Sequence, residues 1–172
     1  DALTLKSLEQ RFEYVFKTEN RYPGAPRIQI NLVDQNKFVL NNVTVIPIKA
    51  SHGLLPITCY RFNNVAYLTD VKTISLSEKK KLKGLDLLIL NALRIEAHPT
   101  HFNLEEALSF VEEIKPKKTY FTHISHKLGL HDEVQKKLPE NVKTIFFFAS
   151  PHYTDKNLKI KDCFKKELLW VK

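Results

Sequence analysis

The 172-residue sequence predicts an α/β fold in which helices pack on a mixed β-sheet. Three observations lead to this prediction. Two hairpin patterns come first along the chain, and an alternation of strand-like and helix-like segments follows them. The hydrophobic fraction of 43% and the charged fraction of 27% are those of an ordinary globular domain. Hairpins give antiparallel strand pairs and strand–helix–strand units give parallel pairs, so the two together predict a mixed sheet.

The first elements are expected from their periodicity. Apolar residues recur at helical spacing in residues 3–16, which predicts an amphipathic helix; they are Leu5, Leu8, Phe12, Val15 and Phe16. The segment 21–27 contains two prolines and a glycine and ends this helix. Residues 28–33 predict a strand. Residues 38–48 and 57–70 each predict two strands joined by an Asn-Asn turn.

The second half of the chain predicts alternating helices and strands. Residues 77–84 predict a short helix that ends at Gly84, and 86–93 form an apolar run typical of a strand buried on both faces. Asn103 and Glu106 have the spacing of a capping box for a helix over 104–115. A strand over 118–123, a helix over 130–138 and a strand over 142–148 follow. We expect Leu87 to Leu90 to be central, with Ala107, Phe110, Val111 and Ile114 packed on the sheet.

Composition narrows the class of protein. The net charge of +8 is spread over several lysine-rich segments, and the aromatic residues fall in strands at core spacing, so a nucleic-acid partner is not expected. No apolar run approaches the roughly 18 residues of a membrane span, and no membrane association is expected. Cys59 and Cys163 are too few for a disulfide framework. We expect a reducing, cytoplasmic location.

Chemically capable side chains stand at or just after the predicted strand ends: His52, Asp70, Asn91, Arg94, His98, His101 and His123. Loops at strand ends are where α/β folds build their sites. Imidazoles and a carboxylate gathered at one edge would suit a divalent metal of the Zn, Mn or Fe type. Taken singly, each has a simpler interpretation: Asp70 could cap a turn, Arg94 could pair with Glu96, and a strand-end histidine is commonly structural. His131 is expected to begin a helix and face solvent.

Five segments, in this order, resemble the second half of a metallo-β-lactamase-fold hydrolase: VIPIKASHGLLPITCYRF (45–62), VAYLTDVKTIS (65–75), KGLDLLILNALR (83–94), HPTHFNLEEAL (98–108) and YFTHISHKLGLHDEV (120–134). The most similar branch is that of PhnP, the phosphoribosyl cyclic-phosphate phosphodiesterase. The resemblance implies part of an αββα sandwich. It implies that residues 1–150 are the C-terminal portion of a hydrolase domain and that 151–172 are a divergent basic tail.

The resemblance also implies roles for particular residues. His52, Asp70 and His123 match metal ligands, with Asp70 bridging two ions, and His101 matches a catalytic histidine that acts on the phosphoryl group or the leaving oxygen. We expect His52, Asp70, His101 and His123 to converge on one edge of the sheet, despite their separation in the sequence. His126 and Arg94 are expected to bind substrate, and His98 to support the site. The implied cofactors are two divalent ions, Zn or Mn, and the implied substrate is a small phosphodiester or cyclic phosphate.

One motif of this family has no counterpart here. The family's HxHxDH segment supplies the other metal ligands, yet no two histidines in this sequence stand at positions i and i+2. The sequence also contains no methionine, so we expect it to begin within a longer protein. Metal binding and hydrolysis by this chain alone are then expected to be weak or partial, and exposed sheet could support self-association. The alternative is a non-catalytic relative that serves as a binding or assembly module.

Overall fold

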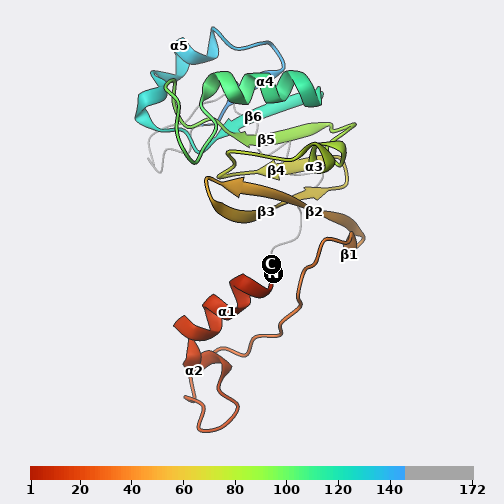
Figure 1. Cartoon of the computed structure of the whole chain (residues 1–172), viewed down its shortest axis with the longest axis vertical. Helices are drawn as coiled ribbons and strands as arrows, with labels where there is room; N and C mark the ends of the chain where they lie inside the picture. Colours follow the sequence, from red (N-terminus) through yellow and green to blue (C-terminus); the bar gives the residue numbers. More distant parts are fainter. Residues whose placement is uncertain (146–172) are drawn as a thin grey trace.

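The structure, a computed structural model, describes residues 1–145. Its described part contains a seven-stranded sheet in which the strands lie side by side in chain order (Figure 1). The strands are β1 (Phe38–Leu40), β2 (Val43–His52), β3 (Leu55–Phe62), β4 (Val65–Leu68), β5 (Leu87–Asn91), β6 (Lys118–Thr122) and β7 (Val142–Thr144). Pairs from β1 to β4 are antiparallel and pairs from β4 to β7 are parallel. The predicted α/β fold with a mixed sheet is confirmed.

The helices are α1 (Ala2–Arg11), α2 (Glu13–Phe16), α3 (Leu76–Lys80), α4 (Leu104–Ile114), the 3-10 helix η1 (His126–Leu128) and α5 (His131–Gln135). Helix α4 begins with the predicted capping box, in which Asn103 accepts from the Glu106 N–H and the Glu106 carboxylate accepts from the Asn103 N–H. Both predicted Asn-Asn turns are present. Asn41, Asn42 and Asn63 have φ values of 47°, 66° and 50°, a left-handed conformation that asparagine tolerates well.

Three predicted elements differ from the structure. The helix over 3–16 is divided at Phe12, whose ψ of 40° leaves the helical region, into α1 and α2. The strand over 28–33 is wrong, because this segment pairs with no neighbouring strand in the described chain and an alternating pattern alone satisfies no backbone group. The helix over 77–84 ends at Lys80, and Gly84, with φ +72°, lies in the turn beyond it.

The end of the predicted sheet is only partly described. Strand β7 spans Val142–Thr144, and residues 146–148 of the predicted strand lie outside the described residues. The basic tail predicted for 151–172 also lies outside them.

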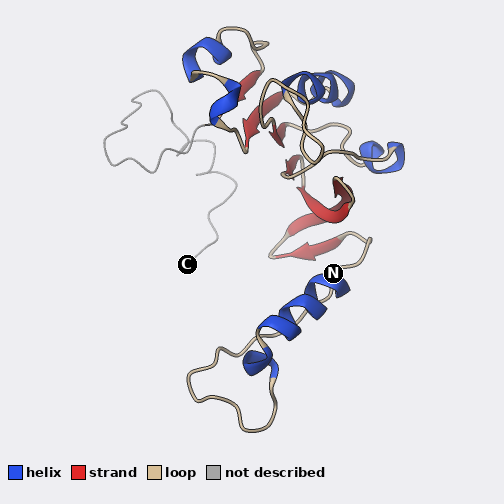
Figure 2. Cartoon of the chain, turned by 60° about the vertical axis from the view of Figure 1, so that its left-hand side comes forward, coloured by secondary structure: helices blue, strands red, loops and turns tan. Residues whose placement is uncertain are grey.

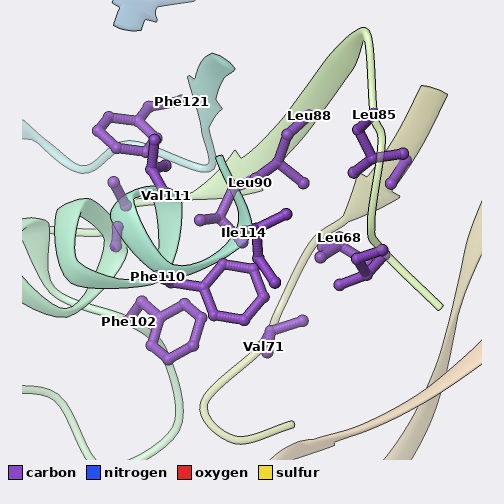
Figure 3. Close-up of a cluster of buried hydrophobic side chains, with 14 of the residues drawn as sticks. Leu68, Val71, Leu85, Leu88, Leu90, Phe102, Phe110, Val111, Ile114 and Phe121 are labelled. Atoms are coloured by element: carbon purple, nitrogen blue, oxygen red, sulfur yellow. The ribbon is translucent and has the colours of Figure 1, made fainter. Parts of the chain in front are cut away.

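The core lies between the sheet and α4, as predicted. Leu88 and Leu90 on β5 are fully buried, and Phe110 and Val111 of α4 pack against them (Figure 3). Ala107 and Ile114 are buried with them. Strand β5 lies between β4 and β6, which confirms that it is central, but Leu87 at its start is only half-buried, so the expected burial holds for Leu88 to Leu90. This packing fixes the strand ends from which the site residues extend.

The N-terminal segment lies apart from this core. Figures 1 and 2 both show α1, α2 and the loop after them beyond β1, at a distance from α4 and α5. Its apolar side chains are largely exposed: Leu3 at 71%, Ile28 at 56% and Leu32 at 61%. No helix among residues 1–145 has the length and apolar character needed to cross a membrane.

Candidate metal centre

The four residues expected to converge come from four different places in the chain. His52 is the last residue of β2, Asp70 follows β4 by two residues, His123 follows β6 directly, and His101 precedes α4. Strands β4, β5 and β6 are parallel, and two antiparallel pairings give β2 the same direction as β4. The carboxyl ends of these strands therefore share one edge of the sheet.

Asp70 lies at the centre of this edge. Its Oδ1 atom is 3.1 Å from Nε2 of His101 and 3.4 Å from Nε2 of His123. The rings of His101 and His123 are stacked with centroids 4.7 Å apart, and the His52 ring meets that of His101 edge-on at 4.4 Å. The predicted convergence of these four residues is confirmed.

The backbone at two of these residues is unusual. Asp70 has φ +61° two residues beyond β4, and His123 has φ +55° directly beyond β6. Aspartate and histidine enter the left-handed region more readily than most residues, but at some cost in free energy. Such conformations persist where surrounding contacts hold them, and they cluster at functional sites.

The contacts of His52 determine which ring nitrogen carries the proton. Its Nδ1 atom lies 3.1 Å from the carbonyl oxygen of Asp70 and 3.0 Å from that of Thr100. A carbonyl oxygen accepts hydrogen bonds and does not donate them, so Nδ1 must carry the hydrogen. In the neutral ring this leaves the lone pair on Nε2. Metal-binding histidines commonly have this arrangement, with the second nitrogen bonded to a carbonyl.

His101 is the most enclosed ring of the group, with a side chain 11% exposed. Its Nε2–H donates to Asp70, and its Nδ1 lies 2.9 Å from the Thr100 hydroxyl and 3.2 Å from Nδ1 of His98. Burial lowers the pKa of His101 below its ordinary value, and the hydrogen bond to Asp70 offsets this only in part. The ring is therefore neutral near pH 7 and can hold one proton at Nε2.

Asp70 stays ionised although its side chain is partly buried. Burial, the largest effect, raises its pKa, but the hydrogen bond from His101, the charge of His123 and the hydrogen bond from Thr69 together hold the pKa below its usual range. An ionised carboxylate is the form that binds a divalent cation.

These residues fit a divalent metal ion. Ligand atoms of His52, Asp70 and His101 lie within 4.8 Å of one another, and Nε2 of His123 faces the same Asp70 oxygen. Imidazole nitrogen and carboxylate oxygen are donors that Zn²⁺ and Mn²⁺ both accept. The geometry allows His101 to be a ligand, whereas the family resemblance gives that role to His123 and a catalytic role to His101.

The other residues singled out in the sequence lie around this cluster or outside it. Arg94 donates from Nε to the Glu96 carbonyl (3.2 Å) and from Nη2 to the Ala97 carbonyl (2.7 Å), so its own loop holds the guanidinium. His126 begins η1 with an exposed side chain, and no hydrogen bond or ring contact joins it to the cluster. Substrate binding by Arg94 and His126 stays a prediction. His131 begins α5, as predicted, but its side chain is half-buried and does not fully face solvent.

Asn91 was among the strand-end candidates in the sequence, but its particular contact could not be predicted. It is fully buried, its Oδ1 accepts from the Val71 N–H (2.8 Å), and its Nδ2 donates to the Val71 carbonyl (3.0 Å). Val71 directly follows Asp70. The available signal was a carboxamide at the end of the apolar run 87–90, since a buried polar side chain needs a specific partner.

Comparison with known proteins shows which protein family the chain belongs to. Residues 1–124 match the family described as the beta-lactamase superfamily domain. Because this match covers most of the chain, the chain belongs to that family, and its fold is the metallo-β-lactamase fold. The resemblance recognised in the sequence is confirmed.

Individual relatives extend this result. A crystal structure of a diphosphatase from the PhnP family is 37% identical, with a TM-score of 0.73 over 83% of this chain and 52% of its own. The metallo-β-lactamase fold protein YhfI from Bacillus subtilis, 20% identical with a TM-score of 0.57, covers 67% of this chain and 52% of its own, and shows the shared fold. An octanoyltransferase from Porphyromonas gingivalis (strain ATCC BAA-308 / W83) is 34% identical over 160 residues, 92% of this chain and 32% of that protein. The chain thus spans about half of these solved relatives and a third of the curated one.

Proposed function

We propose that this chain carries part of the divalent-metal centre, and the acid–base histidine, of a hydrolase that acts on small phosphodiesters or cyclic phosphates. One observation carries the proposal: the Asp70 carboxylate faces both His101 and His123 at one sheet edge, with His52 beside them. Ionised carboxylate and neutral imidazole are the ligand forms that such metals require. The similarity to a PhnP-family diphosphatase supports a phosphoryl substrate.

Each residue has a role that follows from its contacts. His52 would present Nε2 to a metal ion because carbonyl oxygens hold its Nδ1–H. Asp70 and His123 would complete the ligand set from this chain. When bound, two divalent ions would supply an acidified water and charge neutralisation at the phosphoryl group. The neutral His101 ring would first take up the proton that the attacking water releases, and the resulting imidazolium would protonate the leaving oxygen from Nε2.

Acyl transfer, the activity named for the Porphyromonas relative, has less support at this site. Nucleophilic catalysis of acyl transfer needs an activated side chain such as cysteine or lysine. Cys59 is buried, and burial raises the pKa of its thiol to about 11. Lys72 is held by Glu106 at 2.6 Å. The matched region is also only 32% of that protein.

The three ligands that residues 1–145 would supply are too few for a tight centre with two metals, so we propose that further ligands come from residues outside this chain. Apolar side chains of the sheet are available to receive such a segment or a second copy. Val39 and Leu40 on β1 are 69% and 61% exposed, and Tyr67 on β4 is 45% exposed. Strand β1 is also an edge strand of the described sheet, and an exposed edge can pair with another segment.

The test compares hydrolysis of a chromogenic phosphodiester by two samples, each with Zn²⁺ or Mn²⁺. One sample is the chain alone, and the other is the chain joined to a segment that holds the HxHxDH motif. The proposal expects little turnover by the first sample and metal-dependent turnover by the second. If neither sample binds metal or hydrolyses the ester, the chain is better described as a non-catalytic binding or assembly module.

A further inference from the structure

The segment that leaves β5, residues 91–93, contacts the loops that carry the metal-centre residues. Three of these contacts are main-chain hydrogen bonds: Ala92 N–H to the Thr122 carbonyl at 3.1 Å, Leu93 N–H to the Phe102 carbonyl at 3.0 Å, and Ser125 N–H to the Leu93 carbonyl at 2.9 Å. Thr122 and Ser125 flank His123, and Phe102 follows His101. Main-chain contacts of this kind depend on the path of the chain and little on residue type. A further contact is made by a side chain, that of Asn91.

The Asn91 side chain makes hydrogen bonds to the Val71 backbone like those that a neighbouring strand would make. Its carboxamide accepts from the Val71 N–H and donates to the Val71 carbonyl, at 2.8 and 3.0 Å. The left-handed turn at Asp70 takes the chain out of β4, so Val71 lies beyond the strand ladder. Both Asn91 and Val71 are fully buried. A buried main-chain N–H must find a partner, and Asn91 supplies it.

We propose that Asn91 is the positioning residue of Asp70: by holding Val71 it keeps the Asp70 carboxylate between His101 and His123. The side-chain hydrogen bonds of Asn91 go to Val71, so its effect on Asp70 passes through one peptide unit. The left-handed φ of +61° at Asp70 is a conformation that persists only where neighbouring contacts hold it. An apolar side chain at position 91 would leave the Val71 N–H without its partner and free Asp70 to relax.

The experiment uses the full chain labelled with ¹⁵N and records the imidazole nitrogen signals at neutral pH without metal. Three chains are compared: wild type, Asn91→Leu, and Leu88→Ala as a control for lost stability in the same strand. In wild type, His101 should show the fixed tautomer with hydrogen on Nε2. Asn91→Leu should lose this pattern and shift the His123 signals, whereas Leu88→Ala should keep both.

A second readout measures Co²⁺ binding by its visible spectrum. Asn91→Leu should weaken binding by about 10–100-fold, the usual effect of removing an outer support of a metal site. Leu88→Ala should bind as wild type does. If Asn91→Leu does not fold, Asn91→Asp, which keeps the acceptor and loses the donor, is judged by the same two readouts.

The positioning role of Asn91 and the proposed function both involve Asp70. The possible outcomes of these experiments distinguish between the two. Unchanged imidazole signals in a folded Asn91 variant, or equal changes in Leu88→Ala, would overturn the positioning role. If the signals respond to Asn91 but wild type binds no Co²⁺, the positioning role stands and the proposed metal centre fails.

Discussion

The Nε2 atom of His101 lies 3.1 Å from Oδ1 of Asp70, although 31 positions separate the two residues in the sequence. This contact joins the loop after β4 to the start of α4, and His123 approaches the same oxygen from the end of β6 at 3.4 Å. A carboxylate that faces two imidazoles can either hold a proton network or hold metal ions.

Asp70→Asn should abolish Zn²⁺ binding to the chain, because an amide offers no negative charge to offset that of a dication. Calorimetric titration with Zn²⁺ measures this. Asp86→Asn is the matched control, since Asp86 lies before β5 at the other end of the strand and pairs with Lys117 at 2.7 Å. Equal Zn²⁺ binding by the Asp70→Asn and wild-type chains would exclude Asp70 as a ligand.

His101→Gln and His123→Gln should act differently in the chain joined to the HxHxDH segment. His101→Gln should keep the metal and slow phosphodiester hydrolysis by about 10²–10⁴-fold, the range for loss of an acid–base group. His123→Gln should lose metal. Metal content and turnover are measured on the same samples. Loss of metal from His101→Gln, with metal retained by His123→Gln, would reverse the two assignments.

Gly53→Ala should disturb the site more than Gly84→Ala does. Both glycines have a left-handed φ, +63° and +72°, which costs an alanine roughly 1–2 kcal/mol. A Cβ on Gly53 would also lie 2.9 Å from Cγ2 of Thr100, whereas one on Gly84 meets nothing within 4 Å. Thr100 contacts both His52 and His101.

Urea unfolding and Zn²⁺ titration of the two glycine variants check this prediction. Gly53→Ala should lose more stability than Gly84→Ala and should also bind Zn²⁺ more weakly. Equal losses in both variants would mean that the approach of Thr100 to Gly53 has no consequence.

Leu88→Ala should lower the free energy of unfolding by about 2–5 kcal/mol, because Leu88 is fully buried against α4 in the central strand. Leu76→Ala is the control, since Leu76 is 74% exposed, and it should change stability by less than about 0.5 kcal/mol. Chemical denaturation followed by circular dichroism gives both values. A loss for Leu88→Ala as small as that of the control would place β5 outside the core.

Much of the fold could be predicted because local pattern and tertiary packing agree in it. The apolar run ending at Leu90 predicted a central strand, and the Asn103–Glu106 spacing predicted the start of α4. The strand over 28–33 was wrong, because alternation predicts a strand only where a partner supplies its hydrogen bonds, and the described chain supplies none there. Local pattern carries no information on that partner.

The candidate site could likewise be predicted only in part from the sequence. Residues at strand ends could be predicted to meet, because parallel strands end at one edge. The bond between Asn91 and Val71 could not, since it depends on how the crossover through α3 returns β5 beside β4. The donor set alone also does not say whether His101 or His123 binds metal, because both face the same oxygen of Asp70.

Binding of a metal ion at Asp70 can be measured in crystals of the chain soaked in Zn²⁺, because anomalous scattering at the zinc absorption edge locates the ion. We expect an anomalous peak about 2.0–2.2 Å from an oxygen of Asp70, with a nitrogen of His52 or His123 at similar range. An anomalous peak only at other residues, or none at any Zn²⁺ concentration, would exclude a metal ion at Asp70.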